Sequence, residues 1–171
     1  WSCAVPLLAS TAAWPIDAPS AETLIVVQPL RAGLHVVSGV GSNVAVWHGP
    51  DGTVLIDDGV ASLAPQLLAA VQKIAPGPVR VVINTHWHPD HTGGNEHFAG
   101  SGSVLVAHDN VRARLSEPQT VATYDLEVPA AAAGALPIVT FDDALSLHLN
   151  GDRLAALVRD LKQRGLLDDT L

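Results

Sequence analysis

The sequence predicts a single domain of the α/β class, and three observations support this prediction. Short segments of alternating or valine-rich character come first, an amphipathic segment follows, and a nearly continuous apolar segment comes next. The 171 residues suffice for one domain with a sizeable core. Hydrophobic residues make up 48% of the chain and charged residues 15%, a balance that argues against disorder.

The first 21 residues are expected to lie outside the folded domain, which would span residues 22–171. Residues 1–13 are apolar and end in small residues, as at the end of a secretory signal peptide, although the basic start of such a peptide is missing. This run is too short and interrupted to span a membrane. Residues 15–21 are rich in proline and small residues and predict a linker. We therefore expect a signal-peptide remnant and linker on a periplasmic or secreted protein. A loose arm on a cytoplasmic protein is the alternative.

Four strands and a helix are expected at the start of the domain. The strands are predicted where residues alternate or are rich in valine, with glycine-containing turns between them, over 24–28, 34–38, 44–48 and 54–57. Apolar residues recur at helical spacing from Leu63 to Ile74, and the proline-rich residues 76–78 end that helix. Residues 79–83 predict an apolar strand that is buried on both faces.

The second half predicts further elements of both kinds. Residues 103–107 repeat the strand pattern, and residues 111–115 favour a short helix. Prolines break up the region 117–137. Residues 138–141 and 145–149 predict a β-hairpin.

A final helix is expected after this hairpin. Its apolar stripe has helical spacing and consists of Leu154, Leu157, Val158 and Leu161. Asp152 would be its N-cap and Gly165 its stop.

The loop after the apolar strand concentrates possible metal ligands. His86, His88, Asp90 and His91 lie within six positions. Residues two apart in an extended chain project to the same side, so His86 and His88 can reach one ion while Asp90 and His91 turn to a neighbouring position. Imidazole and carboxylate donors together suit zinc best, with iron or manganese as alternatives. The loop therefore predicts a metal site, and a polar loop without metal is the alternative.

At these residues the chain resembles the metallo-beta-lactamase superfamily, whose hallmark is His-x-His-x-Asp-His at the end of a strand. Residues 54–59 and 93–95 resemble the family as well, and the resemblance runs over residues 33–149. It implies an αββα sandwich and a zinc-dependent hydrolase, in which hydroxide on one or two zinc ions attacks a lactam, ester or thioester carbonyl.

The resemblance also implies roles for individual residues. His86 and His88 would bind the first metal, and His91 and Asp90 would hold or neighbour the second. Asp90 would be the catalytic residue that orients or deprotonates the water. Asp57, at the end of the neighbouring strand, would hydrogen-bond to the metal loop and fix its geometry. A turn aspartate ahead of Gly59 is the alternative for Asp57.

One departure from the family pattern concerns the second half of the domain. There the complete fold supplies a third histidine for the first metal, and a carboxylate and a histidine for the second. This chain passes directly from residues 142–151 to residues 152–159, so we expect an incomplete sandwich, shortened near residues 151–152. His86 and His88 leave a catalytic zinc one protein ligand short. The remaining histidines lie outside any metal motif and are His35, His48, His97, His108 and His148. We expect His35 and His48 to face solvent from strands, and His148 to point away from the leucines on either side of it.

The shortened sandwich leaves alternatives open for function and partners. The chain could be a catalytically impaired remnant that serves as a metal-binding or interaction domain, or an iron-dependent persulfide oxygenase. Exposed sheet could be covered by a second copy in a homo-oligomer. A net charge of −8 disfavours nucleic acid, so a small-molecule substrate is expected.

Overall fold

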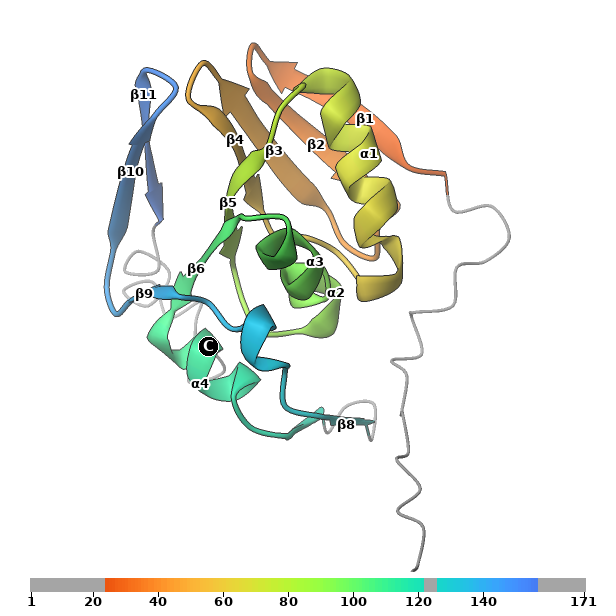
Figure 1. Cartoon of the computed structure of the whole chain (residues 1–171), viewed down its shortest axis with the longest axis vertical. Helices are drawn as coiled ribbons and strands as arrows, with labels where there is room; N and C mark the ends of the chain where they lie inside the picture. Colours follow the sequence, from red (N-terminus) through yellow and green to blue (C-terminus); the bar gives the residue numbers. More distant parts are fainter. Residues whose placement is uncertain (1–23, 122–125, 157–171) are drawn as a thin grey trace, which may run out of the picture.

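A seven-stranded sheet forms the centre of the computed structural model, which describes residues 24–121 and 126–156 (Figure 1). Its strands lie in the order β1-β2-β3-β4-β5-β6-β9. They are β1 (Val26–Arg31), β2 (Leu34–Ser38), β3 (Val44–Gly49), β4 (Gly52–Ile56), β5 (Val79–Asn84), β6 (Val104–His108) and β9 (Val139–Phe141). The first four strands pair antiparallel, and β4, β5, β6 and β9 are parallel neighbours. The α/β class and the six strands expected before residue 108 are confirmed.

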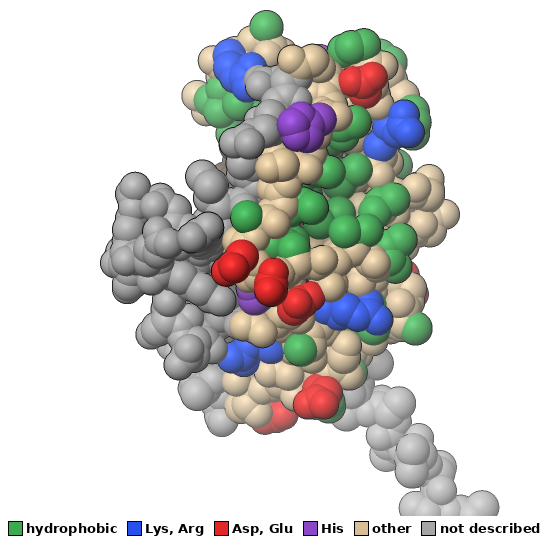
Figure 2. Space-filling model, turned by 90° about the vertical axis from the view of Figure 1, so that its left-hand side faces the viewer, with side chains coloured by type: hydrophobic (Ala, Val, Ile, Leu, Met, Phe, Trp, Pro, Cys, Tyr) green, Lys and Arg blue, Asp and Glu red, His purple; other side chains and the backbone are tan. Residues whose placement is uncertain are grey.

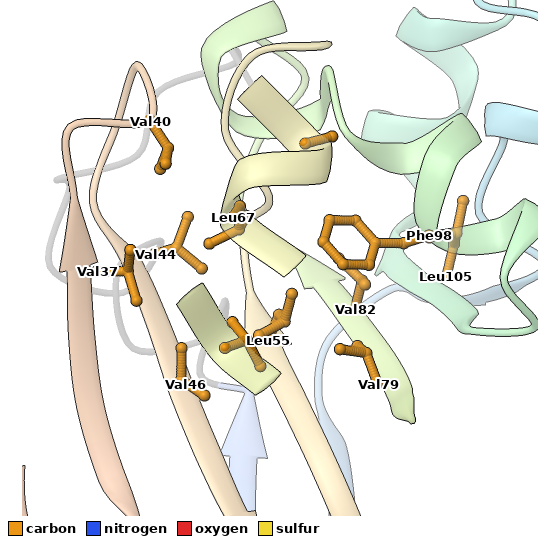
Figure 3. Packing of buried hydrophobic residues seen from close by; sticks show 12 residues of the cluster. Val37, Val40, Val44, Val46, Leu55, Leu67, Val79, Val82, Phe98 and Leu105 are labelled. Carbon is orange, nitrogen blue, oxygen red and sulfur yellow. The ribbon is translucent and has the colours of Figure 1, made fainter. Parts of the chain in front are cut away.

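Helices cover one face of this sheet because their apolar sides fit its buried residues. Helix α1 (Ala64–Ile74) follows a 3₁₀ turn, η1 (Ala61–Leu63), and has proline in its first turn, where the missing N–H has no cost. Its Leu67 and Val71 are fully buried against the sheet, and Phe98 of α3 (Asn95–Gly100) extends the same core (Figure 3). The expected helix is confirmed, and it makes the crossover between parallel β4 and β5.

The other face of the sheet is covered by a two-stranded hairpin, β10 (Leu145–Leu149) and β11 (Asp152–Ala156). Leucines of this hairpin pack with sheet residues in a second cluster around Trp47, Val54, Ile83 and Val106. The described residues thus supply one helical layer, the large sheet and the start of a second sheet. Three of the four layers of an αββα sandwich are present in this part of the chain.

The hairpin leaves part of this apolar face accessible. Hydrophobic side chains gather on the side of the molecule where the hairpin lies (Figure 2). Leu34, Ile56 and Val81 pack in the second cluster but are only partly buried, and Val26 on the edge strand is 47% exposed. Coverage of this face by a second copy of the chain stays a prediction.

Two of the predicted elements in the second half are wrong. Residues 138–141 do not pair with residues 145–149, because β9 lies parallel to β6 and β10 pairs with β11. Residues 152–156, expected to start a helix, form β11. Asn150 and Gly151 have φ values of 55° and 74°, as in a two-residue hairpin turn, so the chain reverses before a helix can begin.

Several predictions are not tested by the described residues. The expected shortening near residues 151–152 coincides with the hairpin turn and stays a prediction. The rest of the expected final helix and the signal-peptide remnant with its linker lie outside the described residues.

Smaller elements complete the described part of the chain. The expected short helix is α4 (Asp109–Leu115), and its N-cap is His108, whose Nδ1 accepts a hydrogen bond from Asn110 N. Residues 117–137, where prolines obscured the pattern, contain β7 (Gln119–Val121), β8 (Leu126–Val128) and a 3₁₀ turn, η3 (Ala133–Ala135). Among the described helices, none has the length and apolar character needed to cross a bilayer.

Reciprocal hydrogen bonds connect the hairpin turn to the turn between β3 and β4. Asp51 N donates to Asn150 Oδ1 at 2.9 Å, and Asn150 N donates to Asp51 Oδ2 at 2.6 Å. Asn150 Nδ2 also donates to the carbonyl of Gly52 at 3.1 Å. These bonds fix the hairpin at the end of the sheet that lies away from the carboxyl ends of β4 and β5.

Replacing Asn150 is expected to loosen the hairpin. Asn150→Ala removes the side-chain bonds and strains a left-handed residue, so we expect a loss of about 1 to 2 kcal/mol. Asn150→Gly removes the same bonds without the strain and is expected to lose less. Hydrogen exchange of the β10 and β11 amides measures the difference. Unchanged protection in Asn150→Ala would show that packing alone holds the hairpin.

Candidate metal centre

The candidate site lies where β5 ends and the chain turns into helix α2 (Pro89–Thr92). His86 and His88 lie in the loop between these elements, and Asp90 and His91 lie on the helix. Because β4 and β5 are parallel neighbours, their carboxyl ends meet at the same edge of the sheet. Residues that follow β4 therefore lie beside the loop.

The structure brings the four predicted ligands together. The ring centroid of His86 lies 4.7 Å from that of His88 and 4.0 Å from that of His91. Asp90 Oδ2 lies 3.2 Å from His91 Nε2. All four side chains are half-buried. The cluster therefore combines three imidazoles and one carboxylate, although no three His, Cys, Asp or Glu side chains in residues 24–121 and 126–156 are arranged to hold one metal ion.

Asp57 joins this loop to the end of β4. Its Oδ1 accepts a hydrogen bond from Thr85 N at 2.7 Å, and its Oδ2 lies 2.8 Å from both Thr85 Oγ1 and His91 Nδ1. Thr85 Oγ1 in turn lies 3.0 Å from His86 Nδ1. The carboxylate thus connects the strand end to two of the clustered histidines, one directly and one through Thr85.

The backbone of Asp57 is held in a left-handed conformation. Its φ is 63°, a region that aspartate tolerates better than most residues, and the residue is 4% exposed. Asp57 N donates to the carbonyl of Ile83 at 2.8 Å, so β5 fixes this conformation. The turn therefore aims the carboxylate at the loop.

The histidines of the cluster differ in the direction of their pKa shifts. The pKa of His86 is lowered to about 4, mainly by burial and also by the neighbouring His91 and His88. Burial also lowers the pKa of His88. Burial opposes the charged form of His91 as well, but its hydrogen bond to Asp57 and the charges of Asp57 and Asp90 prevail and raise its pKa. His86 is therefore neutral at pH 7, with a ring nitrogen lone pair available for a ligand.

Asp58 and Asn84, which the sequence analysis did not single out, hold helix α2 in place by hydrogen bonds. Asp58 is fully buried, its N donates to the carbonyl of His91 at 3.1 Å, and its Oδ1 accepts from Gly94 N at 3.0 Å. Burial raises the pKa of Asp58 well above its usual value despite the Gly94 bond, and the charge of Asp57 adds to the rise. Asn84 Nδ2 also donates to the His91 carbonyl, at 3.3 Å. The sequence signal for this contact was the pair Asp57-Asp58 directly after a strand.

The other histidines lie outside the cluster. His35 and His48 were expected to face solvent, but they are half-buried on β2 and β3 and stack with centroids 5.3 Å apart. His97 lies on α3, and His148 is exposed on β10, as its alternation with leucines predicted. His108 is 4% exposed, and its Nε2 bonds to the carbonyl of Asp142 at 2.6 Å.

Comparison with known proteins identifies the family. The family model described as the metallo-beta-lactamase superfamily matches residues 37–160, which is more than half of the chain. The chain belongs to the metallo-beta-lactamase superfamily. The human protein called metallo-beta-lactamase domain-containing protein 1 is 38% identical over 71 residues, which are 40% of this chain and 26% of that protein. The rat protein of the same name is 37% identical over 71 residues, covering 40% of this chain and 28% of its own length.

Solved metallo-beta-lactamase structures share the fold. A Cronobacter sakazakii metallo-beta-lactamase superposes with a TM-score of 0.65 at 22% identity, covering 77% of this chain and 51% of its own. A B3 metallo-beta-lactamase with an active-site glutamic acid gives 0.60 at 25% identity, with coverages of 78% and 54%. The chain thus spans about half the length of these structures, and its matched segment about a quarter of the curated relatives. The predicted family and fold are confirmed.

The donor chemistry of this metallo-beta-lactamase-family chain suits a divalent metal. Imidazole nitrogens with one carboxylate are the ligand types that zinc takes in proteins, and His86 is uncharged at pH 7. Its Nδ1 lies against Thr85 Oγ1, which leaves Nε2 for a ligand. The ring of His86 lies closer to that of His91 than to that of His88, and within residues 24–121 and 126–156 no three of these side chains are arranged around one ion. Metal binding by these four residues, which the sequence analysis expects, stays a prediction.

Gly93 is expected to be essential for the position of helix α2 in this superfamily member. A Cβ at Gly93 would meet Ala61 N at 2.5 Å, Pro89 O at 2.6 Å and Gly59 O at 2.9 Å, all backbone atoms. Gly93→Ala is therefore expected to lower the free energy of unfolding by about 1 to 3 kcal/mol.

Urea denaturation measures this effect, and Gly100→Ala is the matched control. Gly100 ends the neighbouring helix α3, and a Cβ there would meet nothing within 4 Å. The control is expected to unfold at the same urea concentration as the wild type or a higher one. Equal stability of both variants would contradict the close packing of α2 against the end of β4.

Proposed function

We propose that this chain is a zinc-dependent hydrolase that acts on a small molecule with a lactam, ester or thioester carbonyl. The observation that carries the proposal is the cluster of His86, His88, Asp90 and His91 at the carboxyl end of β5. In parallel sheets this edge is the usual place for ligands. Membership of the metallo-beta-lactamase superfamily supports the same reading.

The residues of the cluster take different parts in this proposal. His86 and His88 would hold one zinc, and His91 and Asp90 would hold or neighbour a second. Bound zinc polarises an electrophilic carbonyl and lowers the pKa of water at the site. Asp90 would accept a proton from water, because its carboxylate is partly exposed and meets His91 through Oδ2, whereas the carboxylate of Asp57 is buried and both of its oxygens are held by Thr85 and His91.

The proposal is tested by hydrolysis assays on the purified chain. A chromogenic lactam, an aryl ester and a thioester are offered to protein that has been stripped with a chelator and then reloaded with zinc or iron. We expect turnover of at least one substrate with zinc, none after stripping, and recovery on reloading. Turnover that survives stripping would contradict the proposal.

The same preparations separate the two alternatives from the proposal. Oxygen consumption with a persulfide, seen with iron and not with zinc, would assign the chain to the oxygenase alternative. Weak binding of at most one ion without any turnover would assign it to a noncatalytic remnant.

A further inference from the structure

Trp87 lies between the two histidines of the loop, and its side chain is anchored away from them. The indole is 7% exposed and packs in a cluster with Ala107 of β6 and with Val111 and Leu115 of α4. The flanking His86 and His88 are half-buried, and their rings contact each other in the cluster of ligands with centroids 4.7 Å apart, while the indole between them packs with those apolar side chains. The buried indole thus fixes the loop against β6 and α4.

The indole also contacts one of these histidines directly. The rings of Trp87 and His88 meet edge to face, with centroids 4.7 Å apart and planes at 77°. The guanidinium of Arg114, on α4, lies over the indole at 5.8 Å from its centroid. Such aromatic and cation–π contacts each contribute about 0.5 to 1 kcal/mol. The ring is therefore held between α4 and His88.

His86 and His88 are oriented by different means. Thr85 Oγ1 lies at hydrogen-bond distance from His86 Nδ1, and Asp57 fixes Thr85. The backbone carbonyl of His88 accepts hydrogen bonds from helix α2, whereas its imidazole makes ring contacts with Trp87 and His86. The direction in which the His88 imidazole points thus depends on the indole.

We infer that Trp87 is a positioning residue, which holds the imidazole of His88 in the orientation needed to bind metal. The inference rests on the proposed metal site and adds to it a residue that does not itself bind the ion. Its aromatic ring, and not only its apolar volume, is the part that matters.

Zinc affinity of three variants tests this inference. Trp87→Leu keeps an apolar anchor but removes the ring, and it is expected to weaken zinc binding about tenfold, as loss of groups that orient ligands does elsewhere. Trp87→Phe keeps an aromatic ring and is expected to retain most of the affinity. Val111→Ala is the matched control, because Val111 is fully buried in the same cluster and lies on α4, outside the loop. It is expected to lower stability and leave affinity unchanged.

Two results would overturn the inference. One is wild-type affinity in Trp87→Leu, and the other is an equal loss in Val111→Ala and Trp87→Leu, which would show a general effect of stability.

A measurement without metal separates failure of this inference from failure of the proposed function. In the metal-free protein, the ring current of Trp87 should displace the imidazole proton resonances of His88 from their positions in an unfolded chain. Trp87→Leu should reduce this displacement to the part that the His86 ring contributes, and Trp87→Phe should keep most of it. If the wild type binds no zinc, the proposed function is wrong. If the His88 resonances of the wild type are not displaced, Trp87 does not position His88.

Discussion

Replacing His86 and His88 together with alanine is expected to reduce zinc binding and hydrolysis to background. The two rings lie 4.7 Å apart on one loop, and His86 is neutral at pH 7 because burial lowers its pKa to about 4. Burial lowers the pKa of His88 as well, which favours the neutral imidazole that binds metal. Competition with a chromophoric chelator measures the affinity, and we expect a loss of at least about 100-fold, since a zinc site deprived of two ligands keeps too few to retain the ion.

His148→Ala provides the matched control for the double variant. His148 is exposed on β10 and is far from the loop in sequence. It belongs to the hairpin, which covers the face of the sheet that the helices do not cover. Its loss is expected to change neither zinc affinity nor turnover. Retained affinity in the double variant would place the metal elsewhere in the chain and contradict the assignment of the loop.

Replacing Asp57 with alanine is expected to weaken both the fold and the metal site. The change leaves Thr85 N and His91 Nδ1 without their acceptor and puts alanine at a φ of 63°. Loss of a buried acceptor together with the strain is expected to lower the free energy of unfolding by on the order of 2 kcal/mol. Zinc affinity should fall about 10- to 100-fold, as for other groups that orient metal-binding histidines.

Asp57→Asn separates these effects. Asparagine tolerates the left-handed conformation and keeps one oxygen for Thr85 N, but it lacks the second carboxylate oxygen that His91 uses. We expect near wild-type stability with an affinity between those of the wild type and Asp57→Ala, measured on folded protein by the same chelator competition. Unchanged metal content in Asp57→Ala would show that Asp57 is only a strand-terminal turn residue.

Much of the fold could be predicted from the sequence where local pattern and final structure agree. The strands up to β4 follow from alternating or valine-rich segments between glycine-containing turns, and β5 follows from a nearly continuous apolar run. Helix α1 follows from its apolar spacing and the prolines that end it. Pairing between distant segments could not be read in this way. The parallel contact of β9 with β6 joins residues more than 30 positions apart, and no local pattern encodes it.

The expected final helix shows why a local pattern can mislead. The stripe that begins at Leu154 fits a helix, and Asp152 suits an N-cap, yet Leu154 packs in the second cluster from a strand. The deciding signal was the pair Asn150-Gly151, a combination that favours positive φ at both positions and hence a tight hairpin. A strong turn outweighed the helical spacing that follows it.

For the site, the motif indicated the clustered residues because they are close in sequence. Thr85 and Asp57 are 28 positions apart, and their contact follows from the parallel pairing of β4 with β5. The sequence placed Asp57 beside the loop only through resemblance to the family. The bracing by Asp58 and the anchoring by Trp87 depend on packing against α2 and α4, which the pattern of residues did not reveal.

The most direct test of the central claim is the metal content of the purified, folded chain, measured as zinc and iron per chain by mass spectrometry. We expect one to two zinc ions per chain in the wild type, and their loss in the His86→Ala/His88→Ala variant. Wild-type protein that folds without stoichiometric metal, or that keeps its metal in the double variant, would contradict the assignment of a metal site to this loop.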